Sequence, residues 1–155
     1  MSSEIGNSEI PLDETLELRG VVVRYPGFWS VERTEDDEKL SVTLNSTGTT
    51  FWMLTIIPGP VDFGSVFEAA IKSYEEEYED VDVYDRLDEE HADWIQQELE
   101  LQCHDLVTKV VLNVMPLEVC SLFILYQGLD SELDNLRPLL DSITSSVRID
   151  PQQLF

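Results

Sequence analysis

The sequence has few basic residues. Only 9 Lys and Arg stand against 32 Asp and Glu in 155 residues, which gives a formal net charge of -23. Such a charge repels phosphate backbones and anionic lipid surfaces, and it attracts basic proteins and cations over a screening length of roughly 8 to 10 Å. We therefore expect neither nucleic acid nor a membrane among the partners.

Long hydrophobic runs and export signals are also missing. No segment approaches the roughly 18 apolar residues of a membrane helix, and the N-terminus lacks the basic start and apolar core of a signal peptide. The two cysteines, Cys103 and Cys120, do not have CxxC spacing. These absences predict a cytoplasmic protein in which both thiols are reduced and buried.

The sequence contains no familiar catalytic or cofactor motif, such as G-x-S-x-G, a P-loop, G-x-G-x-x-G or H-E-x-x-H. Cys103, His104 and Asp105 are consecutive, but neighbouring side chains on a strand point to opposite faces, so they cannot converge as a triad. We expect His104 to mark a turn. The sequence therefore predicts a protein that is not an enzyme and has no cofactor.

The acidic stretch from residue 74 to residue 93 is a candidate for metal binding. An EF-hand frame that starts at Asp80 fails at the glycine position and at the final glutamate. We therefore expect no metal site of that kind. Weak cation binding at the turn Asp88-Glu89-Glu90 stays open as an alternative.

Two hydrophobic periods divide the chain into strands and helices. Period-two segments predict strands at residues 19–25, 28–33, 39–45, 50–57, 81–87, 93–103, 106–114 and 119–127. A helix is predicted from Asp62, with one apolar face made of Phe63, Val66, Phe67, Ala70, Ile71, Tyr74 and Tyr78. A second helix carries Leu133, Leu136, Leu140, Ile143 and Val147. Within it, Pro138 predicts a separate first turn or a kink near Asn135.

This order of elements predicts an α+β domain. Hairpins dominate, so the central sheet should be mostly antiparallel, with about 6 to 8 strands and two main flanking helices. The strand at 119–127 is apolar on both faces and should lie centrally. Residues 18–150 are expected to form this single domain, between a mobile acidic tail at 1–17 and a C-terminal tail at 151–155.

Three features resemble the PsbP-like fold, which is shared by the Ran-binding Mog proteins and the bacterial DcrB-like proteins. They are the stretch YPGFWSV at 25–31 after a strand, a long helix after the fourth strand, and the closing LLDSITSSVRI. The resemblance covers most of residues 19–150. It implies an α/β/α sandwich and a binding protein, assembly factor or secretion chaperone, with no catalytic residue to carry over. Independently of the resemblance, we expect Trp29 to plug the core after the Pro-Gly turn.

Acidic residues crowd the end of the first predicted helix, where the helix dipole disfavours each well-placed anion by about 0.3 to 1 kcal/mol. They are Glu75, Glu76, Glu77, Glu79 and Asp80. One cation, Lys72, cannot offset them. Two interpretations stay open, namely a solvated face that aids solubility and a surface for a basic protein partner.

The leading functional hypothesis is a non-enzymatic domain that binds another protein, as an adaptor or assembly factor. The first alternative is an acidic secretion chaperone with an apolar groove lined by residues such as Trp52, Leu54 and Ile56. The second is a small-ligand carrier, which would need a deep pocket.

Overall fold

Two antiparallel sheets and two helices make up the part of the chain that the computed structural model describes, which is residues 10–37, 39–59, 61–85 and 94–150. The elements in chain order are β1 Glu14–Leu18, β2 Val21–Tyr25, β3 Ser30–Glu35, β4 Leu40–Asn45, β5 Phe51–Pro58, α1 Phe63–Glu77, β6 Asp80–Val83, β7 Ile95–Cys103, β8 Leu106–Pro116, β9 Cys120–Leu129, α2 Asp130–Ser145 and β10 Arg148–Ile149.

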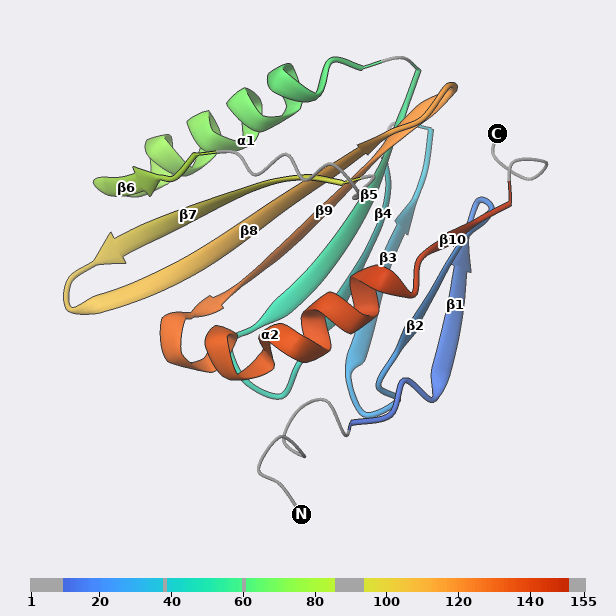
Figure 1. The fold of residues 1–155 in the computed structure, drawn as a ribbon, viewed down its shortest axis with the longest axis horizontal. Coiled ribbons are helices and arrows are strands. Elements are labelled where there is room, and N and C mark those ends of the chain that lie inside the picture. The colour runs from blue at the N-terminus through green and yellow to red at the C-terminus, as the bar shows by residue number, and fades with distance from the viewer. Residues whose placement is uncertain (1–9, 38, 60, 86–93, 151–155) are drawn as a thin grey trace.

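Strand β9 lies at the centre of the main sheet, whose order is β3-β4-β5-β9-β8-β7-β6 (Figure 1). Leu122, Ile124 and Tyr126 point to the face that carries α2. Phe123 and Leu125 point to the face that carries α1. The predicted central position of this strand is confirmed, and so is the antiparallel α+β architecture.

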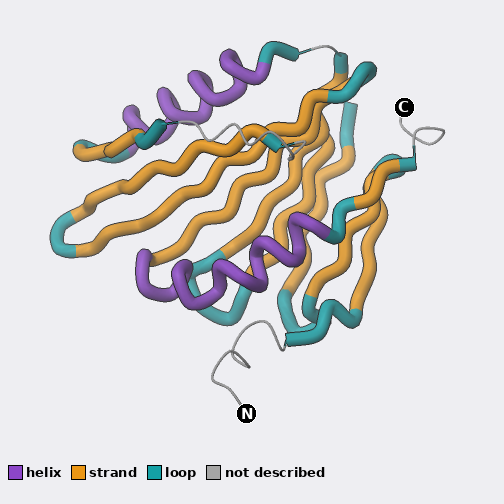
Figure 2. Tube along the Cα trace, viewed as in Figure 1, coloured by secondary structure: helices purple, strands orange, loops and turns teal. Residues whose placement is uncertain are grey.

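Each face of the main sheet has its own hydrophobic core. On one face α1 packs through Phe67, which is fully buried against β7, β8 and β9. On the other face α2 packs through Leu133, Leu140 and Ile143. The small sheet, of order β1-β2-β10, extends this second layer (Figure 2). Trp29, with 4% of its surface exposed, belongs to the second core, so its predicted role is confirmed.

The segment at 19–25 does not join the main sheet as the first strand of a meander. Its ordered part is β2, which pairs with β1 and β10. A tight turn at Arg19 and Gly20, with φ of 49° and 88°, forms the β1-β2 hairpin. The partners of β2 are β1, just before it in the chain, and β10, near the C-terminus. The meander of the main sheet therefore begins at β3.

Strand β1 begins inside the segment 1–17 that we predicted to be a mobile tail, and for residues 14–17 that prediction was wrong. Leu16 and Leu18 alternate with exposed residues and are buried in the second core. Two apolar positions in an acidic segment are a weak signal for a strand. Residues 1–9 and the predicted tail at 151–155 lie outside the described residues.

The apolar groove proposed for a secretion chaperone does not exist at Trp52, Leu54 and Ile56. All three side chains are buried under α2 and the small sheet. The indole N–H of Trp52 also donates to the Thr144 hydroxyl of α2 at 3.0 Å. The alternation of apolar residues along β5 correctly predicted an apolar face, but α2 covers that face.

Two smaller expectations also differ from the structure, and a third agrees with it. Helix α2 runs continuously from Asp130 and contains Pro138, so it has no separate first turn; packing on both sides of the proline holds its two halves in one helix. Cys103 is exposed at the end of β7 and only Cys120 is buried, although both are free thiols. His104 lies in the β7-β8 turn with φ of 59°, as predicted.

A carboxylate in the first turn of α2 fixes that helix to the turn between β4 and β5. Glu132 Oε1 accepts hydrogen bonds from the Thr49 N–H, the Thr50 N–H and the Thr50 hydroxyl at 2.9, 2.8 and 2.6 Å. These bonds, the Thr50 hydroxyl first, lower the pKa of Glu132 below its usual value. The position also favours an anion because it lies at the positive end of the helix dipole.

Replacing Leu16 tests whether β1 belongs to the folded domain. We expect Leu16→Ala to lower the free energy of unfolding by about 2 to 4 kcal/mol, because it leaves a cavity in the core. The matched change Thr15→Ala, at an exposed site on the same strand, should stay within about 0.5 kcal/mol of the parent. Urea unfolding measures both, and equal stability of the two variants would mean that β1 is a dispensable tail.

The Glu132 anchor should make stability depend on pH. Its pKa is lower in the folded state, so its contribution is complete above the usual value of 4.5 and is lost as the pH falls through the folded-state pKa. We expect Glu132→Gln to be less stable than the parent by about 1 kcal/mol at neutral pH, after allowance for its partial exposure. The difference should shrink in acid; an unchanged difference would show that the charge of Glu132 contributes nothing.

Candidate protein-docking surface

The five acidic residues predicted from the sequence lie together where α1 ends and β6 begins (Figure 1). All five side chains, Glu75, Glu76, Glu77, Glu79 and Asp80, are exposed. The last turn of α1 contains no basic residue. Helix α2 differs, because two of its acids, Asp130 and Glu132, lie in its first turn. The acids at the end of α1 therefore oppose the helix dipole, whereas Asp130 and Glu132 are stabilised by the dipole of α2.

Strands β6 and β7 bring more acids to the same end of the molecule. In the register between them, Asp82 lies directly opposite Glu100. Like charges in this position destabilise a strand pair. Glu98 points to the same face of the sheet as Glu100, two residues along β7. This is the face that carries α2, opposite to α1, and Glu98 pairs there with Arg137 of α2 at 3.2 Å. We call this region the acidic end; it consists of Glu75, Glu76, Glu77, Glu79, Asp80, Asp82, Asp85, Glu98 and Glu100.

The sequence reasoning missed the contribution of β7 to this surface. It predicted that Glu98 and Glu100 lie on the wet face of a strand, but it did not predict that this strand pairs with β6. The pairing brings residues near position 82 and residues near position 100 into contact. A search for acids at alternating positions on candidate neighbouring strands would have suggested it.

A hollow of about 300 Å³ opens at the acidic end. Its lining consists of Tyr84, Asp85, Glu98, Glu100 and Lys109. The Tyr84 hydroxyl donates to Glu100 Oε1 at 2.8 Å, and this bond raises the pKa of Tyr84. Lys109 pairs with Asp134 at 3.1 Å, which raises the pKa of the lysine. Among the described lining residues, Lys109 is thus paired with Asp134 and Glu98 is paired with Arg137 of α2, so Asp85 and Glu100 leave the hollow with a negative charge.

Two tyrosines fix the end of α1 to the sheet beneath it. The rings of Tyr74 and Tyr78 lie 6.3 Å apart, and the Tyr74 hydroxyl donates to Gln127 Oε1 of β9 at 2.6 Å. Burial, with smaller effects of Tyr78 and Glu77, raises the pKa of Tyr74 well above its usual value. Both belong to the apolar stripe predicted for α1. The exposed acids beside them therefore stand on an anchored helix end.

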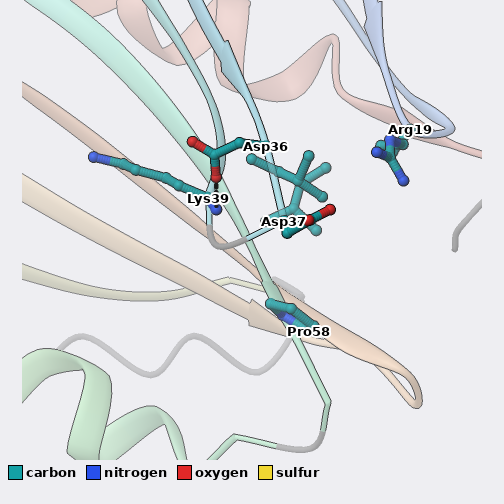
Figure 3. Close-up of a pocket in the computed structure, with 7 residues that line it drawn as sticks. Arg19, Asp36, Asp37, Lys39 and Pro58 are labelled. Carbon is teal, nitrogen blue, oxygen red and sulfur yellow. Dashed lines mark hydrogen bonds between the residues drawn. The ribbon is translucent and has the colours of Figure 1, made fainter.

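A different hollow, of about 240 Å³, lies near the β3-β4 turn and is lined in part by Arg19, Asp36, Asp37 and Lys39 (Figure 3). The Lys39 backbone N–H donates to Asp36 Oδ1 at 2.7 Å. The Lys39 side chain extends away from Asp37 and Arg19. Charges of both signs line this hollow without converging, so we do not choose it as the candidate site.

The described part of the chain supplies no metal centre and no membrane helix. Within it, no three side chains of His, Cys, Asp or Glu come together in a way that could hold a metal ion. Neither of its helices has the length and apolar content needed to cross a membrane. The predicted weak cation turn at 88–90 lies outside the described residues.

Comparisons with known proteins identify the fold. No family model matches the sequence, and no curated protein matches it either. The solution structure of PsbP (CyanoP) from Synechocystis sp. PCC 6803 matches with a TM-score of 0.64 and 14% identity, over 85% of this chain and 88% of that chain. The Ran-binding protein Mog1p of Saccharomyces cerevisiae matches with a TM-score of 0.63 and 6% identity, over 92% and 98%.

The architecture is thus an α+β sandwich with a helix on each face of an antiparallel sheet. More particularly, the chain has the PsbP-like fold, so the fold resemblance inferred from the sequence is confirmed. At these identities the comparisons establish the fold alone.

Reversing two charges at the end of α1 should stabilise the protein. We expect the double variant Glu76→Lys and Glu79→Lys to melt about 2 to 4 °C above the parent at low salt, because cations suit a helix C-terminus and relieve repulsion there. The gain should fade at high salt. A lower melting temperature at low salt would show that these acids are not opposed to the helix dipole.

Proposed function

We propose that this chain is a non-enzymatic protein-binding domain, an adaptor or assembly factor, whose acidic end docks a basic surface of a partner protein. The observation that carries the proposal is the placement of the acids. Glu76 and its neighbours oppose the dipole of α1, and Asp82 faces Glu100 across two strands. Both placements lower stability, and both occur at the same end of the molecule.

A basic partner would relieve both kinds of repulsion when it binds. Lys or Arg side chains would complement the exposed acids at the end of α1 and on the edge strand β6. A net charge of -23 would steer such a partner over a longer range and raise its association rate. The same charge would make the complex sensitive to salt.

The structural neighbours support protein binding only in general terms. Mog1p is described as a Ran-binding protein, but it shares 6% identity with this chain. No binding residue is transferred from it, and the nature of the partner rests on the charges of this chain. The secretion-chaperone alternative has lost the groove on which it was based, since Trp52 and Leu54 are buried.

Charge reversal combined with affinity capture tests the proposal. We expect the parent to retain a defined protein from its own cell extract at low salt and to release it at high salt. The variant with Glu76→Lys and Glu79→Lys should lose it, because the substitutions place cations against a basic surface.

The matched control reverses two exposed acids elsewhere, Glu32→Lys on β3 and Glu118→Lys between β8 and β9. It has the same net charge as the test variant and should keep the partner. If both variants lose the partner, binding depends on the net charge of the protein and not on the acidic end. Retention by both, or no retained protein with the parent, would contradict docking at the acidic end.

A further inference from the structure

The α1 side of the main sheet is only half covered. Helix α1 lies over β6, β7 and β8 (Figure 1). Beyond it, Phe123 of β9 and the residues of β5 on the same face, Phe51, Met53 and Ile57, remain partly exposed. The opposite face differs, because α2 and the small sheet bury its side chains on both β4 and β5.

Two adjoining hollows follow the flank of α1 above these residues. One, of about 450 Å³, is apolar and is lined by residues that include Ile57, Val66, Ala69 and Phe123. The other, of about 360 Å³, contains Tyr74, Glu77 and Gln127. Ala70 lines both, so the two hollows meet at that residue, and we treat them as one groove. We call the apolar hollow together with the neighbouring β5 side chains the shelf, which consists of Phe51, Met53, Ile57, Val66, Ala69, Ala70 and Phe123.

The dimensions of this groove suit a helix of about three turns. From Val66 to Glu77 helix α1 rises roughly 16 Å, at 1.5 Å per residue. Packed helices lie about 8 to 10 Å apart, and that is two strand spacings of about 4.8 Å. Because α1 is centred over β7, a helix beside it would have its axis above β9 and would adjoin the side chains of β5. Beyond β5, strand β4 carries the small polar side chains Ser41 and Thr43 on this face.

The two ends of the groove differ in charge, and this difference indicates which side chains a bound segment must present. The shelf end contains no charged side chain among its lining residues. The other end contains Glu77 and borders Glu76 and Glu79 of the acidic end. An occupant must therefore present apolar side chains along one face and basic side chains at one terminus.

A second copy of this chain does not meet that requirement, because each copy carries a formal charge of -23. The chain's own segments outside the described residues do not meet it either. Residues 1–9 and 86–93 carry a net negative charge, and residues 151–155 contain no Lys or Arg.

We propose that the groove binds an amphipathic helix of the partner protein, lying antiparallel to α1, with Lys or Arg in its first two turns. This inference rests on the proposed function and specifies how the partner binds. In the antiparallel direction the positive end of the partner's helix dipole adjoins the negative end of α1. Its basic residues then reach Glu77 while its apolar face covers the shelf.

Designed peptides test the requirement for an amphipathic helix. The test peptide has about 18 residues, leucine at helical spacing and four lysines in its first two turns. A second peptide has the lysines in its last two turns, and a third has the same composition with the leucines scrambled. Because lysines near the N-terminus weaken a helix, the peptides are stapled to equal helicity, which circular dichroism checks. By fluorescence anisotropy we then expect the first peptide to bind about tenfold more tightly than either of the others. Equal binding of the first two would overturn the antiparallel direction.

Two substitutions on neighbouring positions of α1 separate shelf contact from charge. Ala69→Gln places an amide over the shelf, whereas Glu68→Gln places the same side chain at an exposed position outside both hollows and removes one acid. We expect Ala69→Gln to weaken the first peptide about tenfold and Glu68→Gln to weaken it less than about twofold. Unchanged melting temperatures would confirm that both variants are folded.

The outcomes distinguish the two proposals. If the scrambled peptide binds as well as the first, or if Glu68→Gln weakens binding more than Ala69→Gln, the shelf is not a docking site and the acidic end alone binds basic partners. If no peptide binds while the parent still captures a partner that is lost on charge reversal, the inference of a helix in the groove is wrong and the proposed function stands. If neither peptide nor partner binds, both are wrong.

Discussion

The structure depends on the burial of β9. This strand is apolar on both faces and lies between β5 and β8. An antiparallel sheet can expose one face to water, but a strand of this kind needs apolar cover on both. The fold meets the requirement with α2 and the small sheet on one side and with Phe67 of α1 on the other. The path of α1 over β7 and β8 then brings its C-terminus to the edge strand β6, so the location of the acidic end follows from the packing of the core.

Local sequence patterns predicted most of the helices and strands. They did not predict which strands pair, because the paired strands can lie far apart in the chain. Period-two alternation indicated the strands of the main sheet, and one apolar stripe indicated α1. The segment 19–25 was wrongly placed in the main sheet, and residues 14–17 were wrongly placed in a tail. Both errors have one cause, the small sheet: β2 pairs with β10, more than 120 residues later in the chain, and Leu16 of β1 packs in the same layer. Alternation also showed that Trp52 lies on an apolar face, but it could not show that α2 covers that face. Periodicity identifies which side of an element is buried and does not identify what buries it.

The acidic end also has one part that the sequence predicted and one part that depends on strand pairing. The acids at the end of α1 were visible as a run in the sequence, and their conflict with the helix dipole needed only the helix boundary. The opposition of Asp82 and Glu100 depends on the register of β6 against β7 and could not be predicted without it. The hollow beside Tyr84 likewise joins residues of β7 and β8 to two residues that follow β6. The sequence therefore predicted one part of the acidic end, and the sheet topology adds the rest.

Solubility alone would not distinguish one acid position from another, because any exposed carboxylate adds to the net charge. This chain does distinguish them. Glu132 lies where the helix dipole and three donors stabilise it, whereas Glu76 and Asp82 lie where neighbouring charges and dipoles oppose them. Each exposed charge has only a small effect on stability, so the fold tolerates this arrangement. A basic partner of the proposed kind would convert the same repulsion into binding energy, and the apolar shelf beside α1 would add the contact area that charge alone does not provide. Charge would then set the direction of approach, while burial of the shelf would determine how long the complex lasts.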